Sequence, residues 1–499
     1  VPIEPVEPST ERAFTAGSAN GAASLPLLRL RRHSRETGAT LASGPMADQI
    51  GAERGRPPEQ WGSSLGFVLA AAGSAVGLGN LWGFAYRASQ GGGAAFVLLY
   101  VLIVAVVCLP VLVAEMVLGR STGHAPLVAP ITAGGRRWAP MGWLYIAGSV
   151  GILSYYAVLM GWTGRSLLHA LTSPLPADMA AAESFFAGIS SGGDAVLGHL
   201  LSLALTGLVV AAGIRSGIER LSRWGMPLLF LVLLALLLWA AGLPAAHEGY
   251  AGFLLRWDAS KLTDLTTIRN AFTQAFFSIG AGIGCILAYA AYLDRRSGIP
   301  GQAVAVVGMD TAVGLMAGCV TFPIVASFGL ADVVSSSTVG TLFIALPTGL
   351  GSLGLAGRVV AAAFFALAYV AAITSSVSLL EVPVSSLMDR LGWSRPRAVW
   401  LMVAVIAVIG LPSALDVAVL EKMDAVFGGV CLIAGGLLMA LLMGWRAPER
   451  FSSDLRGSGT SPRLLRLLLW GLRWVSVPVI SLGLIVSVVD LAKSWSGGA

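Results

Sequence analysis

Two glycine-rich stretches lie near the middle of long apolar segments. The first reads Gly73-Ser74-Ala75-Val76-Gly77-Leu78-Gly79-Asn80, and the second reads Ser278-Ile279-Gly280-Ala281-Gly282-Ile283-Gly284. A glycine costs a helix about 1 kcal/mol relative to alanine, so both stretches favour unwound backbone. Unwound carbonyl groups can coordinate a cation, and the N-terminal ends of half-helices can hold an anion such as a carboxylate. The alternative is that the glycines only allow close helix packing. The presence of two such stretches favours a binding site.

Oxygen-bearing side chains inside other apolar segments are also candidates for chemistry. Ala371, Thr374 and Ser375 are spaced i, i+3 and i+4, which places them on one helix face. Hydroxyl and carbonyl oxygens suit a hard cation such as sodium, although hydroxyls in a helix can also bond to their own backbone. Asp310 lies about a dozen residues inside an apolar segment. An ionisable group at that depth is costly, which makes it a functional candidate.

Composition places these residues in a membrane. The chain has 499 residues, 56% of them hydrophobic and 12% charged, with a mean hydropathy of +0.79. Soluble proteins carry about 25% charged residues, so a soluble enzyme, a disordered chain and a nucleic-acid binder are excluded. The four cysteines all lie in apolar runs and are interpreted as packing residues. The five histidines are scattered without metal-ligand spacing, which argues against a membrane enzyme.

Eleven apolar windows are long enough to span a bilayer, which needs about 20 residues each. They cover 63–86, 91–118, 138–164, 195–214, 224–245, 270–293, 298–328, 359–388, 398–415, 425–445 and 467–489. Placing the N-terminus in the cytoplasm puts sixteen arginines in the inner loops, against eight arginines and lysines outside. This bias predicts a cytoplasmic N-terminus. Residues 1–57 are rich in Pro, Gly, Ser, Ala and Arg. We expect either a disordered tail or an extension that precedes a translation start at Met46.

The first two spans carry a recognisable pattern. It consists of Trp61-Gly62-Ser63-Ser64-Leu65-Gly66-Phe67, the glycine-rich stretch continued by Leu81-Trp82, Gly91-Gly92-Gly93-Ala94-Ala95-Phe96 and Glu115-Met116-Val117-Leu118-Gly119-Arg120. From about Trp61 to the last span the chain resembles the neurotransmitter:sodium symporter family. The resemblance implies an all-α polytopic membrane protein with the leucine-transporter fold, a five-plus-five inverted repeat in which helices 1 and 6 are broken. The transporter domain is expected over 58–499, with repeats at about 61–245 and 268–445 and an additional span at about 467–489.

The resemblance also implies two sodium sites and a substrate pocket. Sodium site 1 would use the Ala75 carbonyl with Asn80, Ser278 and Asp310. Sodium site 2 would use the carbonyls of Gly73, Val76 and Ala371 with the hydroxyls of Thr374 and Ser375. The substrate pocket would comprise Ala75, Leu78, Gly79, Ile152, Tyr156, Phe277, Gly280, Ile283, Ser375, Ser376 and Leu379. Tyr156 would bind the substrate carboxylate, Phe277 would act as a lid, and Gly280 would leave room for a bulky or aromatic side chain.

Both gates depart from the family pattern. Trp61, Tyr292 and Asp389 fit the inner gate, but Pro58 stands where an arginine is usual, which leaves Arg54 or Arg56 as the expected partner of Asp389. Asp424 fits the outer gate, but Gly83 replaces its arginine. Two interpretations stay open there. Either Arg87, one helical turn further along, replaces the missing arginine, or Asp424 has lost its partner.

The predicted function is sodium-coupled import of a neutral, apolar or aromatic amino acid. Asp310 stands where other members have asparagine, and its negative charge predicts that transport is independent of chloride. The protein is not expected to be an enzyme or to need a cofactor other than sodium as coupling ion. Its expected partners are sodium, a small amino acid and the lipid bilayer of a bacterial inner membrane, with no nucleic acid. The oligomeric state stays open. A membrane sensor that binds an amino acid without transporting it is the alternative.

Overall fold

The computed structural model describes residues 59–330 and 341–496, and within these ranges the chain is helical with no strand. Nine helical segments of the described part are long and apolar enough to cross a membrane. They run over Ala94–Thr122, Arg136–Thr172, Gly192–Ala211, Ile214–Ala240, Ile299–Phe328, Gly354–Leu391, Arg395–Leu415, Val417–Arg446 and Pro462–Lys493. The expected extension at residues 1–57 lies outside the described residues.

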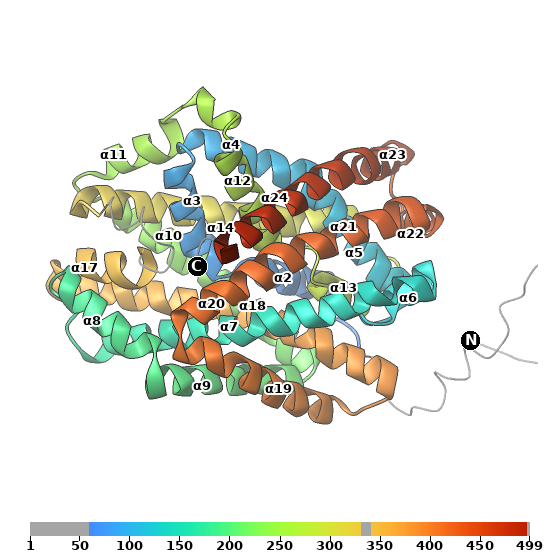
Figure 1. The fold of residues 1–499 in the computed structure, drawn as a ribbon, viewed down its shortest axis with the longest axis horizontal. Coiled ribbons are helices and arrows are strands. Elements are labelled where there is room, and N and C mark those ends of the chain that lie inside the picture. The colour runs from blue at the N-terminus through green and yellow to red at the C-terminus, as the bar shows by residue number, and fades with distance from the viewer. Residues whose placement is uncertain (1–58, 331–340, 497–499) are drawn as a thin grey trace, which may run out of the picture. The chain divides into compact units, whose positions relative to one another are not determined.

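Figure 1 labels the individual helices that make up these segments and the connections between them. They include α4 (Ala94–Ile103), α5 (Leu109–Thr122), α7 (Ala139–Thr172), α9 (Gly192–Ala211), α10 (Arg220–Ala240), α14 (Ile299–Phe328), α18 (Gly354–Leu391), α19 (Arg395–Leu415), α21 (Leu432–Leu441) and α24 (Val477–Ser496). Further helices are α6 (Ala129–Gly134), α8 (Met179–Ser190), α11 (Ala246–Tyr250), α17 (Leu346–Gly351), α20 (Val417–Met423), α22 (Pro448–Gly457) and α23 (Pro462–Trp470).

The first span is broken within the first glycine-rich stretch. Helix α2 (Ser64–Ala75) ends where Val76 adopts an extended conformation, with φ −71° and ψ 105°. Helical structure resumes at Gly79 and continues as α3 (Phe84–Gln90), and the two parts are bent by 66°. The break leaves carbonyl groups near the end of α2 without partners in their own helix.

The second glycine-rich stretch breaks the chain in the same way. Helix α12 (Leu265–Ile279) ends at Gly280, and α13 (Cys285–Ala290) begins after Gly284. Gly280, Gly282 and Gly284 have φ values of +66°, +103° and +79°, which side-chain-bearing residues rarely adopt. The window 270–293, which was counted as a span, therefore consists of two helices that are each too short to cross a membrane. The described residues contain nine candidate spans, or ten with the bent first pair, and the count of eleven is not confirmed.

Helices α7 and α18 are the centre of the packing. They lie against each other, and both are buried all round over residues 148–163 and 371–386. A helix that is buried on every side needs no solvent-facing polar stripe, and the buried polar side chains of these segments, such as Ser375 and Glu381, are hydrogen-bonded inside the protein. Helices α9, α10 and α24 instead expose leucines such as Leu201, Leu238 and Leu482, as expected of surfaces that face lipid. The central pair carries Tyr156 and Ser375, which contact the broken first span.

Candidate functional site

A cluster of polar side chains joins the two broken spans to α14. Asn80 follows the first break, Ser278 lies at the end of α12, and Asp310 lies within α14. All three side chains are buried. The Asn80 amide donates to Ser278 Oγ at 2.8 Å and to Asp310 Oδ1 at 2.7 Å, and the Ser278 hydroxyl donates to Asp310 Oδ2 at 2.7 Å. Three of the four residues expected at sodium site 1 are thus in contact, whereas the fourth, Ala75, lines the neighbouring pocket.

Tyr100 of α4 completes this cluster. Its hydroxyl donates to Asp310 Oδ2 at 3.2 Å and lies 3.2 Å from Ser278 Oγ. The tyrosine ring is itself fixed edge-on against Phe84. A carboxylate inside a membrane protein must be compensated by donors or cations. The Asp310 carboxylate accepts hydrogen bonds from side chains of three other elements. The carboxylate, amide and hydroxyl oxygens of this cluster could together coordinate a sodium ion.

A second oxygen cluster lies where α18 meets the end of α2. The Ser375 hydroxyl lies 3.3 Å from the Gly73 carbonyl, 3.1 Å from that of Val76 and 3.2 Å from that of Ala371. The Thr374 hydroxyl donates to the Ala371 carbonyl at 3.0 Å. All five residues expected at sodium site 2 therefore meet at one point. Three carbonyls and two hydroxyls form an oxygen-only set, which is the donor chemistry that a hard cation prefers.

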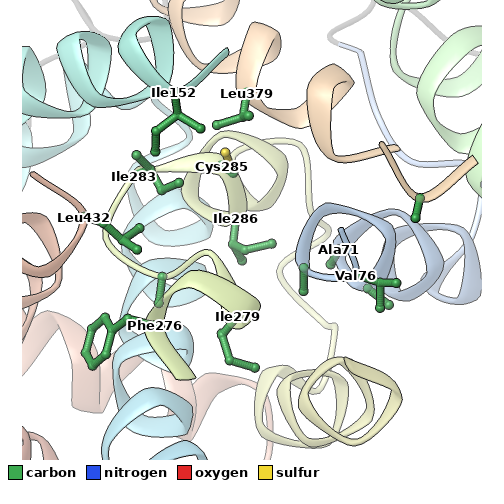
Figure 2. Packing of buried hydrophobic residues seen from close by; sticks show 14 of the residues in the cluster. Ala71, Val76, Ile152, Phe276, Ile279, Ile283, Cys285, Ile286, Leu379 and Leu432 are labelled. Carbon is green, nitrogen blue, oxygen red and sulfur yellow. The ribbon is translucent and has the colours of Figure 1, made fainter. Parts of the chain in front are cut away.

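A pocket lies between the two clusters. Its wall includes Ala75, Ile152, Tyr156, Phe277, Gly280, Ile283, Ser375 and Leu379, all of them expected at the substrate site. Figure 2 shows Ile152 and Leu379 close to Ile283 beside the unwound stretch that follows α12. The cavity volume is about 40 Å³, which holds a few water molecules rather than an amino acid. The walls must separate to admit a substrate, and the two helix breaks are the places where the backbone can bend.

The remaining expected pocket residues lie behind the wall. Leu78 contributes its backbone, whose N–H donates to the Tyr156 hydroxyl at 3.2 Å. Gly79 lies against Phe277, since a Cβ there would come within 2.6 Å of the Phe277 ring. The Ser376 hydroxyl is directed away from the pocket and lies 2.8 Å from Thr206 Oγ1. A one-residue step along α18 turns the side chain by about 100°, so adjacent serines face different neighbours.

Several pocket residues were not anticipated. Ser74 and Ser378 line the pocket and bond to each other at 2.7 Å, and Cys285 and Leu432 lie on the same wall. Ser378 is three residues after Ser375, so helical spacing could have found it. Leu432 and Tyr100 come from distant helices, and nothing local in the sequence marks them.

At the outer gate, Asp424 and Arg87 have different hydrogen-bond partners. The Asp424 carboxylate accepts a hydrogen bond from the Tyr155 hydroxyl at 2.7 Å. The Arg87 guanidinium donates to the side chain of Gln274, and Gln274 in turn donates to the Gly79 carbonyl at 3.3 Å. Within the described part of the chain Arg87 and Asp424 form no ion pair. Each has its own hydrogen-bond partner, because Arg87 points toward α12 rather than across to Asp424.

The inner side is held by a network centred on Arg395. Its guanidinium donates to Glu381 at 2.6 Å and to Glu59 at 3.0 Å, and the Tyr292 hydroxyl donates to Glu381 at 2.9 Å. The chain before the first span and the chain after α13 are thereby tied to α18 and α19. Trp61 adds a hydrogen bond from its indole to the Tyr289 carbonyl at 2.9 Å.

Asp389 has a histidine as its partner. Its carboxylate lies 3.1 Å from His124 Nδ1 and accepts the Ala125 backbone N–H at 3.0 Å. The expected partners Arg54 and Arg56 lie outside the described residues. The hydrogen bond to Asp389 raises the pKa of His124 above its ordinary value, against an opposing effect of burial.

The family model of the sodium:neurotransmitter symporters matches residues 58–186 and 179–495. The chain belongs to this family. It is 34% identical over 406 residues to the sodium-dependent transporter YhdH of Bacillus subtilis, covering 77% of this chain and 87% of that protein. It is 32% identical to the sodium-dependent transporter MJ1319 of Methanocaldococcus jannaschii, covering 70% and 74% of the two chains.

A solved structure gives the same assignment. The crystal structure of MhsT in complex with L-phenylalanine is similar with a TM-score of 0.79 and 35% sequence identity, covering 86% of this chain and all of MhsT. The predicted all-helical leucine-transporter fold is therefore confirmed. The symporter is a multi-pass membrane protein. Because its family consists of sodium-dependent secondary transporters, it is not an enzyme.

Proposed function

We propose that this symporter couples the entry of sodium to the import of a neutral amino acid with an apolar or aromatic side chain. One observation carries the proposal. The break in the first span, together with the helix residues at its two ends, takes part in both oxygen clusters and in the pocket between them. Gly73 and Val76 supply carbonyls to the second cluster, Asn80 belongs to the first, and Ala75 and Gly77 line the pocket. Ions that order this stretch also shape the substrate site, which is the physical basis of coupling.

The polar end of the pocket suits the backbone of an amino acid. The partial negative charge at the C-terminal end of α2 favours cations such as sodium and the substrate ammonium group. The Tyr156 hydroxyl and the Leu78 N–H, now bonded to each other, are two donors for a carboxylate. We infer that the substrate carboxylate takes the place of this contact.

The rest of the wall selects the side chain. Ile152, Ile283, Leu379 and Leu432 are apolar, and the described lining of the pocket contains no charged side chain. A charged substrate side chain would lose its hydration there without finding a partner. A Cβ built on Gly280 meets nothing within 4 Å, so this position leaves space for a large substituent. The complex of MhsT with L-phenylalanine supports an aromatic substrate.

Chloride independence rests on Asp310. The Asp310 carboxylate belongs to the cluster formed with Asn80 and Ser278. It already supplies the negative charge that balances a bound sodium ion. The bilayer orientation inferred from the loops places the N-terminus in the cytoplasm, and we assign the protein to a bacterial inner membrane. Each sodium ion then moves down a potential worth about 2.3 kcal/mol per 100 mV, which drives accumulation of the substrate.

The test is uptake by purified protein in liposomes. A panel of labelled amino acids is offered with an inward sodium gradient, with potassium replacing sodium and gluconate replacing chloride in controls. Accumulation of apolar or aromatic amino acids that requires sodium but not chloride supports the proposal. Binding without accumulation would instead identify a sensor, an alternative that the transporter relatives do not favour. Preference for a charged amino acid would contradict the assignment of the pocket.

A further inference from the structure

A second, larger pocket lies at the end of the bundle opposite the outer gate. It is formed by the end of α5, the loop after α13 and the segment from Trp445 to Gly457, and its volume is about 1100 Å³. Helix α22 packs against α5 beside it, and Figure 1 shows α22 at the same end as α6. This is the arginine-rich side, which the loop charges place in the cytoplasm.

The charge of this pocket is positive. Arg295, Arg446 and Arg450 line it, and Arg450 is held by a hydrogen bond to the Ser121 carbonyl at 3.3 Å. Among the residues that the structure describes, neither Arg295 nor Arg446 has a carboxylate within ion-pair distance.

The acidic residues of the pocket only partly offset the arginines. Asp454 is engaged by Arg120, which lies behind the pocket, at 2.5 Å. Glu449 remains as a single carboxylate against three guanidinium groups. The Ser121 hydroxyl on the same wall is buried, and the described structure gives it no hydrogen-bond partner. The pocket thus presents guanidinium donors to an anion.

The pocket opens at the level where lipid headgroups lie. Trp445 is both part of its wall and 49% exposed, and its ring packs edge-on at 5.1 Å against Trp474, which is 58% exposed. Exposed tryptophans mark the boundary between hydrocarbon and headgroups. A basic pocket at this level on the cytoplasmic side is typical of anionic lipid binding.

We propose that this pocket binds the phosphate group of an anionic phospholipid headgroup, with Arg295 and Arg446 as its principal ligands. Guanidinium groups match phosphate oxygens with paired hydrogen bonds. A free phosphate ion offers the same chemistry, but the tryptophan pair beside the opening favours a ligand that is anchored in the bilayer. The site is separate from the substrate pocket, so the proposal does not depend on the transported amino acid.

The test uses the purified full-length protein in neutral detergent. Binding of dioleoylphosphatidylglycerol is measured by native mass spectrometry, with dioleoylphosphatidylcholine as the lipid of no net charge and inorganic phosphate as competitor. The variant R295Q/R446Q removes the two arginines that have no ion-pair partner. The variant R136Q/R137Q removes the same charge from the same side of the membrane, at two exposed arginines outside the pocket.

We expect the pocket variant to bind phosphatidylglycerol roughly twenty-five-fold more weakly, about fivefold for each arginine lost. The control variant should keep the wild-type affinity, and excess phosphate should displace little lipid. Efficient displacement by millimolar phosphate would instead assign the pocket to a free anion and overturn the lipid assignment. Equal weakening in both variants would mean that the lipid responds only to overall surface charge, which overturns the site. An unchanged affinity in both variants would overturn it as well.

Discussion

The Ser375 hydroxyl lies 3.1 Å from the carbonyl oxygen of Val76, the residue at which the first span stops being a helix. The contact joins α18 to the break itself. A helix end that leaves carbonyls unpaired must satisfy them elsewhere, and here a single hydroxyl reaches two of them, those of Gly73 and Val76. An ion at this point would hold the break in one geometry.

Replacement of Ser375 by alanine should weaken the response to sodium. Loss of one oxygen ligand and its hydrogen bonds costs about 1–3 kcal/mol, so the sodium concentration for half-maximal uptake should rise about tenfold. Ser376→Ala is a matched control, since its hydroxyl faces Thr206. Equal sodium dependence in the two variants would show that Ser375 is no ion ligand.

Asp310→Asn should make transport depend on chloride. The variant loses the fixed negative charge next to the first oxygen cluster but keeps an oxygen and the shape of the side chain. Uptake in gluconate should fall about tenfold, as expected for the loss of an interaction worth about 1.4 kcal/mol, and chloride should restore part of it. Wild-type protein should behave alike in both anions. A variant that is equally active with and without chloride would argue against this role of Asp310.

Two glycines of the second break should respond differently to alanine. A Cβ on Gly282 would lie 2.2 Å from the Leu432 carbonyl, at a φ of +103°, so Gly282→Ala should prevent folding. A Cβ on Gly280 meets open space and carries only the strain of left-handed backbone, about 1–2 kcal/mol. Gly280→Ala should fold and should lose uptake of phenylalanine more than that of alanine. Size-exclusion profiles and an uptake panel measure both effects, and an unchanged preference in Gly280→Ala would remove this residue from the pocket.

The contact between His124 and Asp389 should depend on pH. Asp389 favours the protonated imidazole and raises the pKa of His124. The stabilisation is therefore complete below the unfolded pKa of about 6.5 and is lost as the pH rises through the higher folded value. In NMR titration of histidine-labelled protein, Asp389→Asn should lower the pKa of His124. An identical His124 titration in both proteins would show that the pair is not formed.

The outer gate can be examined by double-mutant cycles. Because Arg87 bonds to Gln274 while Asp424 bonds to Tyr155, Arg87→Ala and Gln274→Ala should be coupled by about 1 kcal/mol in substrate binding. Arg87→Ala and Asp424→Ala should be coupled more weakly, because no hydrogen bond or ion pair joins the two side chains in the described structure. Strong coupling of Arg87 to Asp424 would restore the idea that Arg87 replaces the missing gate arginine.

The residue types along the sequence determined where both spans are broken and which helix face carries the oxygen-bearing groups. Glycine at positions 73, 77 and 79 and at 280, 282 and 284 marks both breaks, because glycine disfavours a continuous helix. At 280, 282 and 284 the positive φ values are also strained for other residues. The spacing of Ala371, Thr374 and Ser375 puts three oxygen-bearing groups on one helix face whatever the helix packs against. The long apolar segments and the charge bias of the loops were likewise sufficient to predict an all-helical membrane protein.

Only the tertiary structure decided which distant groups meet. Tyr100 reaches Asp310 because α4 packs against α12, whose Ser278 contacts both side chains. Leu432 enters the pocket wall from α21, which the local sequence does not mark. Ser376 lies outside the pocket because its position on α18 directs it toward α9. Arg87 bonds to Gln274 and not to Asp424 because helix packing directs its side chain toward α12. A side chain's partner depends on rigid-body helix packing, which is fixed by the sum of many contacts rather than by the residues next to it in sequence.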